Sequence, residues 1–136
     1  MAFRSTWIEE KRIIYTEMIG TMTSNEAQEI SDAHIKFLNE GAAPVHLIVD
    51  LTQLKEVPTN LRQNTSMAGY LQHPSLGWTV LIGGNVLLNF MLSILGHVFK
   101  FRYVKRATLE ESLAYLVSQD QTLTTAYERL VARSQH

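Results

Sequence analysis

The sequence predicts an α/β fold: a mixed, mostly parallel sheet with an N-terminal hairpin, crossover helices and an extra C-terminal helix. Short apolar runs alternate with amphipathic segments along the chain. Residues 45–51, Val-His-Leu-Ile-Val-Asp-Leu, are typical of a central strand buried on both faces. The chain has 136 residues, enough for one core. We expect a single domain at 1–136, with a core at about 6–117 and a helical extension at about 118–133.

Two strands are predicted before the first helix, at residues 7–10 and 12–19. Alternation in the second strand places Ile13 on one face and Ile14 on the other. The very short connection between the strands favours a tight turn and therefore an antiparallel hairpin. We expect Gly20 to end this hairpin.

The first helix is predicted to begin after a capping box formed by Thr23 and Glu26. Its apolar residues recur at the spacing of one helical stripe. These residues are Ala27, Ile30, Ala33 or His34, Phe37 and Leu38. Gly41 is placed to end the helix, because glycine is favoured just beyond a helix C-terminus.

After the central strand the sequence predicts a loop at residues 52–58 and a second helix from about 59 to 71. This helix is weak, because several of its residues disfavour helical backbone. They are Asn64, Thr65, Ser66 and Gly69. Residues 78–82, Trp-Thr-Val-Leu-Ile, then predict another buried strand.

The C-terminal third is predicted to contain a very apolar helix at 86–97, a half-exposed strand at 99–104, and then helices. Thr108 and Glu111 form a second capping box. The helix after it has an inner stripe of Leu109, Leu113, Leu116 and Val117. A break or bend is expected near 118–121, before a last amphipathic helix.

Bulk composition excludes several classes of protein. Apolar residues make up 46% of the chain and charged residues 18%, as in a folded domain. Twelve basic and thirteen acidic residues leave a net charge of −1, so we expect no nucleic-acid partner. There is no cysteine, which excludes disulfides and thiolate metal sites. No signal peptide and no apolar run of spanning length is present, so we expect a cytoplasmic protein without a membrane partner.

The order of elements and half of a motif resemble the STAS domain, the SpoIIAA-like fold of bacterial anti-sigma factor antagonists. Val-Asp-Leu-Thr at 49–52 matches the family's strand ending, and the loop at 53–57 has the family's length. Thr-Leu-Glu-Glu-Ser-Leu at 108–113 matches a later family feature. Pro58 and Leu61 stand where the family has Asp and Gly.

The resemblance implies that the residues around the end of the central strand contact a regulatory partner. We name this set the exit corner: Asp50, Thr52, Pro58, Thr59 and Asn60. Thr59 stands where the family has its phosphorylated serine and is therefore the candidate phospho-acceptor. From the residues alone, Asp50 has two interpretations: a ligand group at a strand end, or an acceptor of backbone N–H groups that fixes the next segment.

A second candidate site follows the strand at 78–82. Gly83, Gly84 and Asn85 join this strand to the helix at 86–97, and backbone N–H groups at such a turn can bind an anion. The alternative is that the glycines serve the turn and Asn85 caps the helix. The five histidines have no metal-ligand spacing, so we expect neither a metal nor a cofactor.

The helix at 86–97 has almost no polar face, so both of its sides need to be covered. One interpretation is a homodimer that buries the second side. The candidate interface residues are Leu87, Asn89, Phe90, Met91, Ser93 and Ile94. The alternative is that the C-terminal helix at 121–133 covers it within one chain.

Basic residues concentrate at one place, formed by Lys100, Arg102, Lys105 and Arg106. This cluster indicates a solvated edge, or a weak site for an acidic partner. No nucleophile is paired with a base along the chain, so we expect no enzyme. The function predicted is a regulatory, protein-binding domain; the alternative is a carrier or sensor of a small apolar or anionic ligand.

Overall fold

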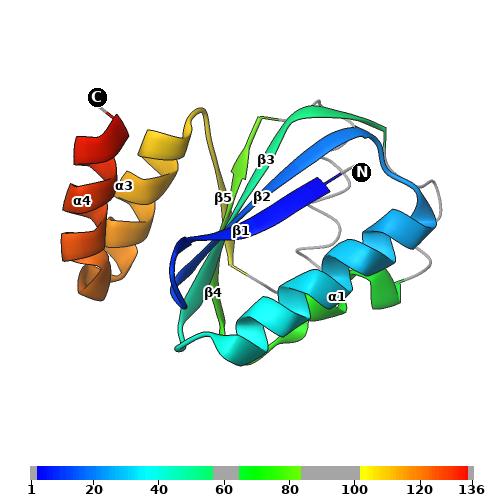
Figure 1. Ribbon diagram of the computed structural model, residues 1–136, viewed down its shortest axis with the longest axis horizontal. Helices are drawn as coiled ribbons and strands as arrows, with labels where there is room; N and C mark the ends of the chain where they lie inside the picture. Colours follow the sequence, from blue (N-terminus) through cyan, green and yellow to red (C-terminus); the bar gives the residue numbers. More distant parts are fainter. Residues whose placement is uncertain (1–2, 57–64, 84–101, 135–136) are drawn as a thin grey trace.

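The protein consists of a five-stranded sheet with helices packed on both faces (Figure 1). The structure is a computed structural model and describes residues 3–56, 65–83 and 102–134. The strands are β1 (Phe3–Glu9), β2 (Ile13–Thr21), β3 (Val45–Glu56), β4 (Leu76–Ile82) and β5 (Tyr103–Arg106). The helices are α1 (Ser24–Glu40), α3 (Leu109–Gln119) and α4 (Thr124–Ser134), with 3₁₀ segments η1 (Thr65–Gln72) and η2 (Gln121–Leu123).

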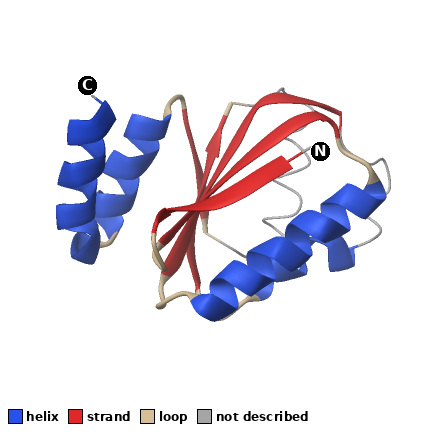
Figure 2. Ribbon diagram, viewed as in Figure 1, coloured by secondary structure: helices blue, strands red, loops and turns tan. Residues whose placement is uncertain are grey.

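The strands follow the order β1-β2-β3-β4-β5 across the sheet (Figure 2). β1 pairs antiparallel with β2, and each of the later pairs is parallel. The predicted fold class, a mostly parallel sheet with an N-terminal hairpin and an extra C-terminal helix, is therefore confirmed. β5 lies at one edge of the described sheet. The bounds predicted for this strand, 99–104, are wrong: Arg102 precedes β5, which extends to Arg106, and residues 99–101 lie outside the described residues.

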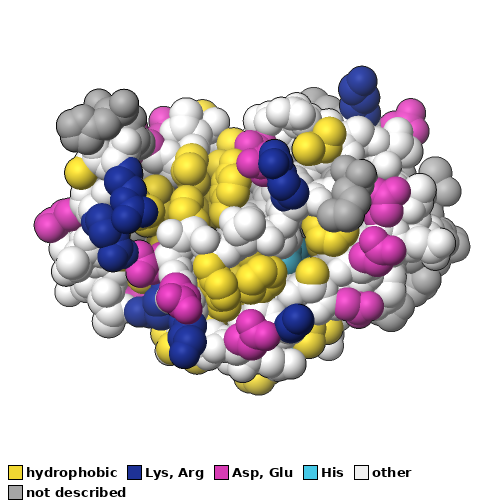
Figure 3. Space-filling view, viewed as in Figure 1, with side chains coloured by type: hydrophobic (Ala, Val, Ile, Leu, Met, Phe, Trp, Pro, Cys, Tyr) yellow, Lys and Arg dark blue, Asp and Glu magenta, His cyan; other side chains and the backbone are white. Residues whose placement is uncertain are grey.

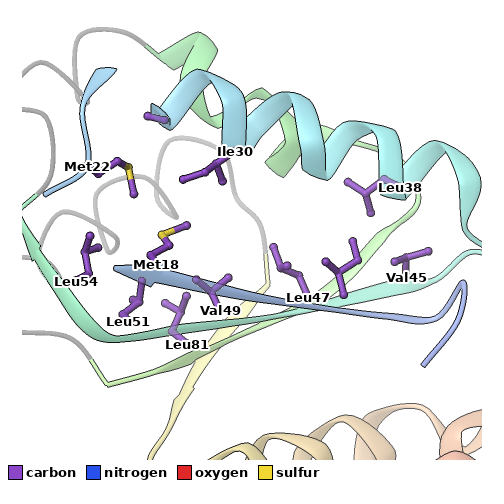
Figure 4. Packing of buried hydrophobic residues seen from close by; sticks show 12 residues of the cluster. Met18, Met22, Ile30, Leu38, Val45, Leu47, Val49, Leu51, Leu54 and Leu81 are labelled. Atoms are coloured by element: carbon purple, nitrogen blue, oxygen red, sulfur yellow. The ribbon is translucent and has the colours of Figure 1, made fainter. Parts of the chain in front are cut away.

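One face of the sheet, which we call the α1 face, is covered by α1 and η1 (Figure 1). Alternate side chains of β2 and β3 point to this face and pack beneath α1 (Figure 4). They include Ile14, Met18, Leu47, Val49 and Leu51. Ala27, Ile30, His34 and Leu38 are buried on α1, which confirms its predicted stripe.

The opposite face, the α3 face, is covered by α3 and α4 (Figure 1). Its buried cluster consists of Ile13, Ile48, Val80, Ile82, Leu113, Leu116 and Leu123. Tyr127 and Leu130 of α4 pack against this cluster. The apolar stripe of α4 is therefore turned towards the α3-face cluster. The predicted helix at 86–97 and its candidate dimer residues lie outside the described residues. Whether a second subunit or the C-terminal helix covers this helix therefore stays a prediction.

Two threonines begin α-helices as the sequence predicted. The Glu26 N–H donates to the Thr23 hydroxyl at 3.2 Å, and the Glu111 N–H donates to the Thr108 hydroxyl at 3.1 Å. The first box is only half of the predicted arrangement, because the Glu26 carboxylate accepts from the Thr23 hydroxyl. Gly41 ends α1 with extended backbone, and a Cβ there would lie 2.5 Å from the start of β3.

Several boundary predictions are wrong. Residues 52–56 belong to β3 and not to a loop, because they pair with the end of β2 through Gly20–Leu54 and Thr21–Glu56. Gly20 therefore lies inside β2, at φ 74, where the pairing register shifts. The described part of the predicted helix at 59–71 is a 3₁₀ segment, in keeping with its poor α-helical residues.

Charge is distributed unevenly over the surface. Acidic side chains gather where α1 lies, and basic side chains gather over α4 (Figure 3). Within the described ranges, no helix is long and apolar enough to cross a bilayer.

A chain of polar side chains runs beneath α1. The Ser5 and Thr16 hydroxyl oxygens are 2.7 Å apart, and the Thr16 hydroxyl is hydrogen-bonded to His34 Nε2 at 2.8 Å. His34 is fully buried and its ring meets Tyr70 edge to face at 4.6 Å. Burial lowers the pKa of His34 to about 3, so the imidazole is neutral in the folded protein.

Acid should destabilise the protein partly through His34. Between pH 6.5 and about 3 the imidazole takes up a proton in the unfolded chain only, so unfolding becomes easier as the pH falls. His34 alone contributes a slope of up to about 1.4 kcal/mol per pH unit. Urea unfolding between pH 6 and 4 should show a shallower pH dependence for His34→Gln than for wild type. Equal slopes would contradict the prediction.

Candidate functional site

The described part of the exit corner is built around Asp50. The Tyr15 hydroxyl donates to Asp50 Oδ2 at 3.2 Å. The Thr52 N–H and hydroxyl donate to Asp50 Oδ1 at 2.9 and 2.7 Å. The second interpretation from sequence is thus confirmed: the carboxylate accepts a backbone N–H two residues on and fixes the chain there.

Asp50 fixes a local irregularity of the sheet. Glu17 pairs with Asp50, but Ile19 pairs with Gln53, so β3 has one extra residue at this point. Such a bulge breaks the ladder and leaves backbone groups to be satisfied by side chains. The Asp50 carboxylate holds Thr52 within the bulge, which explains why a polar residue follows the apolar run of β3.

The described residues of the two sites predicted from sequence lie close together, because Gly83 approaches Thr52. β4 ends at Ile82 beside Asp50, while parallel β3 continues to Glu56, and Gly83 follows β4 directly. A Cβ on Gly83 would lie 2.6 Å from Thr52 Cγ2, and its φ of 73 also favours glycine. The other members of the two sites lie outside the described residues: Pro58, Thr59, Asn60, Gly84 and Asn85.

Asp50 belongs to a row of side chains that crosses the α3 face. Strand pairing aligns one residue of each strand along this row: Arg4, Glu17, Asp50, Ile82 and Arg106. Arg4 and Glu17 form an ion pair at 3.2 Å. Burial raises the pKa of Tyr15 to about 12, helped by the charges of Asp50 and Glu17. Tyr15 is therefore a neutral hydrogen-bond donor at physiological pH.

The side chains described at this corner hold one another in place. Asp50 accepts three hydrogen bonds from Tyr15 and Thr52, and these bonds fix the position of its carboxylate beside the bulge. Among the described residues, no group of three His, Cys, Asp or Glu side chains is placed to hold a metal.

Comparison with known proteins rests on structure. No protein-family model and no curated protein sequence matches the chain. An uncharacterised protein of the DUF3478 family from Shewanella loihica, with a SpoIIAA-like fold, matches with a TM-score of 0.62 and 12% identity over 85% of this chain and 92% of that one. The Bacillus cell-fate determinant SpoIIAA in its phosphorylated form matches with a TM-score of 0.55 and 16% identity over 85% and 99%.

The unphosphorylated form of the anti-sigma factor antagonist SpoIIAA matches in the same way, with a TM-score of 0.57 and 15% identity over 86% of this chain and 97% of that chain. This chain has the SpoIIAA-like fold. The SpoIIAA-like resemblance predicted from the central strand and from residues 108–113 is confirmed for the fold. Function does not follow from similarity at this level of identity.

The sequence did not predict a polar cluster at the opposite end of the sheet. His46 Nε2 lies 2.9 Å from Asp120 Oδ2, and Arg12 Nη2 lies 2.8 Å from the same oxygen. The Thr122 N–H donates to Asp120 Oδ1 at 3.1 Å. The cluster ties the start of two strands to the junction between α3 and η2.

Hydrogen bonding fixes the protonation of this cluster. The Trp78 N–H donates to His46 Nδ1 at 3.0 Å, so Nε2 carries the proton and donates to Asp120. Burial lowers the pKa of His46, although Asp120 opposes this. Burial alone would raise the pKa of Asp120, but hydrogen bonds from His46 and Thr122 and the charge of Arg12 lower it to about 2.

The local signal for Asp120 was the helix break predicted at 118–121, where an aspartate can cap the next turn. His46 also stood out as a polar residue in an apolar strand. Their pairing spans 74 residues, so no local pattern connects them.

Removing the Asp120 charge should destabilise the fold strongly. Asp120→Asn leaves Arg12 and His46 without their carboxylate, and losing charge-assisted hydrogen bonds at such a partly buried site costs about 2 kcal/mol. Urea denaturation at pH 7 measures this, with Glu128→Gln on the exposed side of α4 as the control. In wild type the contribution of Asp120 is present above pH 3.8 and lost as the pH falls to about 2. A loss below about 0.5 kcal/mol would contradict a structural role.

Tyr15 should titrate at a lower pH when Asp50 loses its charge. Asp50→Asn removes the carboxylate that raises the pKa of Tyr15, so this pKa should fall from about 12 towards 10, while burial keeps it above the ordinary value. NMR titration of ring-labelled tyrosine measures the shift, and Tyr15→Phe assigns the signal. An unchanged Tyr15 titration would show that the two groups are not coupled.

Proposed function

We propose that the protein is a non-enzymatic regulatory domain that binds another protein through its exit corner. The observation that supports this most is the rigid arrangement at Asp50. Its carboxylate is held by Tyr15 and Thr52 and holds the β3 bulge, while Thr52 and Gln53 remain exposed beside it. This edge therefore presents a fixed polar surface for recognition.

Thr59 is proposed as the site at which this binding is controlled. One solved SpoIIAA structure is of the phosphorylated form of that protein. By the resemblance, Thr59 occupies the matching position here, a few residues beyond the described end of β3. A phosphate on Thr59 would add about two negative charges three residues beyond Glu56, the described end of β3. Like-charge repulsion would then change which partner the corner accepts.

We propose further that the protein is a homodimer, through Leu87, Asn89, Phe90, Met91, Ser93 and Ile94. The support is the sequence of the segment 86–97, which is apolar around nearly its whole circumference. The apolar stripe of α4 is already packed on the α3 face. It is therefore less available to cover this segment within one chain.

A second candidate function, a carrier of a small ligand with a polar head group, has one observation in its favour. Ser31 Oγ and His34 Nδ1 are both buried on α1 and lack hydrogen-bond partners among the described residues. Buried polar atoms without partners are costly, so a bound polar group would stabilise them. Gly83, Gly84 and Asn85 would supply further donors in this alternative.

The binding proposal predicts that charge at Thr59 changes partner capture. Tagged wild type, Thr59→Ala and Thr59→Asp are used to capture proteins from the native host, and partners are quantified by mass spectrometry. Thr59→Ala should retain the main partner, and Thr59→Asp should lose most of it. Thr125→Asp, on exposed α4, serves as the matched control and should behave as wild type. Equal capture by Thr59→Asp would contradict a phosphate switch.

Native mass spectrometry tests the proposed homodimer and the alternative of a ligand carrier. Native mass spectrometry at micromolar concentration should give twice the chain mass for wild type, and the single chain mass for Ile94→Glu, because a charge at an apolar interface opposes association. A monomeric wild type would contradict the dimer. An additional bound mass of a few hundred daltons, retained in wild type, would instead favour the ligand carrier.

A further inference from the structure

β4, β5 and α3 carry a continuous stack of arginine and aromatic side chains. The Arg102 guanidinium lies over the Trp78 ring, 5.4 Å from its centre, and that of Arg106 lies over Tyr115 at 4.6 Å. The two rings meet edge to face with centres 5.1 Å apart. We call these four side chains the arginine–aromatic row. It lies on the α3 face at the β5 edge of the described sheet.

The two guanidinium groups of the row have no carboxylate partner among the described residues. By contrast, Arg4, Arg12 and Arg129 each form an ion pair with an acidic side chain. The nearby Glu111 carboxylate accepts the Ala107 N–H at 3.0 Å. The row therefore presents positive charge that the described part of the molecule does not neutralise.

Stacking also fixes where these charges lie. A guanidinium over an aromatic face gains cation–π attraction and loses conformational freedom before any partner arrives. Arg106 additionally donates to the Lys105 carbonyl at 2.7 Å. Arginines held in this way bind carboxylates at a lower entropic cost than free surface lysines.

The spacing indicates the shape of the ligand. Arg102 and Arg106 are four residues apart on one side of an extended segment, which places their Cα atoms about 13 Å apart. Val104 lies between them on the same face and packs on the α3-face cluster. Alternate side chains of an extended peptide repeat every 6.6 Å or so, which matches acidic residues two or four positions apart.

The chemistry of the surroundings favours an acidic peptide over a nucleic acid. Trp78 and Tyr115 already pack against each other and against the arginines, so neither offers a free platform for a base. Two guanidinium groups are also too few for strong phosphate-backbone binding.

We propose that the arginine–aromatic row is a second binding surface, which takes an extended acidic segment of a partner protein on Arg102 and Arg106. It borders the exit corner, because Arg106 pairs with Ile82 and Ile82 with Asp50. It uses different residues and the opposite charge, so it does not depend on the function proposed for that corner.

The test measures binding of a fluorescein-labelled octapeptide of alternating Glu and Val by anisotropy, at about 0.1 M salt. The double variant Arg102→Gln/Arg106→Gln should bind at least about tenfold more weakly than wild type, since each arginine contributes charge-assisted hydrogen bonds. The matched control is Lys105→Gln/Arg133→Gln. It removes the same charge from the other face of β5 and from α4, and should bind within about twofold of wild type.

Several outcomes would overturn the proposal. One is equal loss of affinity in the two double variants, since only general charge would then matter. Others are equal binding of a Lys-Val peptide, or tighter binding of single-stranded DNA or of vesicles containing anionic lipid through the same two arginines. Each of the latter results would assign the row to a different class of partner.

A second readout does not depend on the folding of the arginine variants. In Trp7→Phe, the fluorescence reports Trp78 alone, because the chain has two tryptophans. The acidic peptide should shift or quench this signal in a saturable manner that parallels the anisotropy. Saturable binding without any change at Trp78 would place the peptide elsewhere and would overturn the proposal.

Discussion

β3 must be covered on both faces, and the rest of the structure depends on this constraint. Leu47, Val49 and Leu51 point to the α1 face, while Ile48 points to the α3 face, and all are at most 3% exposed. A strand of this kind is stable only between two layers of helix, because each exposed leucine or isoleucine would forgo about 2 kcal/mol of burial. The hairpin of β1 and β2 and parallel β4 extend the surface on which those layers pack.

The same constraint explains the two polar residues within β3. His46 and Asp50 lie four residues apart on the α3 face, where α3 and α4 cover the strand unevenly. His46 is 2% exposed, so it is satisfied internally by Asp120 and by the Trp78 N–H. Asp50 is only half-buried and is satisfied by neighbours on β2 and β3. One polar residue therefore anchors the helices, and the other remains at a surface.

The features that the sequence predicted correctly depend on contacts between near neighbours. Thr23 and Thr108 cap helices through N–H groups three residues on, and Asp50 holds Thr52 two residues on. The missed features depend on distant pairing. β3 extends to Glu56 only because the end of β2 lies beside it, and the arginine–aromatic row requires β4, β5 and α3 to be assembled. The proximity of Gly83 to Thr52 is a distant contact that the sequence could still have predicted. It follows once β3 and β4 are taken as parallel neighbours.

The charges on the α3 face also restrict how two partners would share it. Along the aligned row, the negative residues Glu17 and Asp50 lie on β2 and β3, and Arg106 lies on β5. Adjacent strands are about 4.8 Å apart, so Asp50 and Arg106 are separated by about 10 Å, close to one screening length. An acidic segment on Arg106 would be repelled if it ran across the sheet towards Asp50. It would be attracted by Arg102 if it ran along β5. The face therefore favours one direction for an acidic segment and leaves the exit corner open to a different contact.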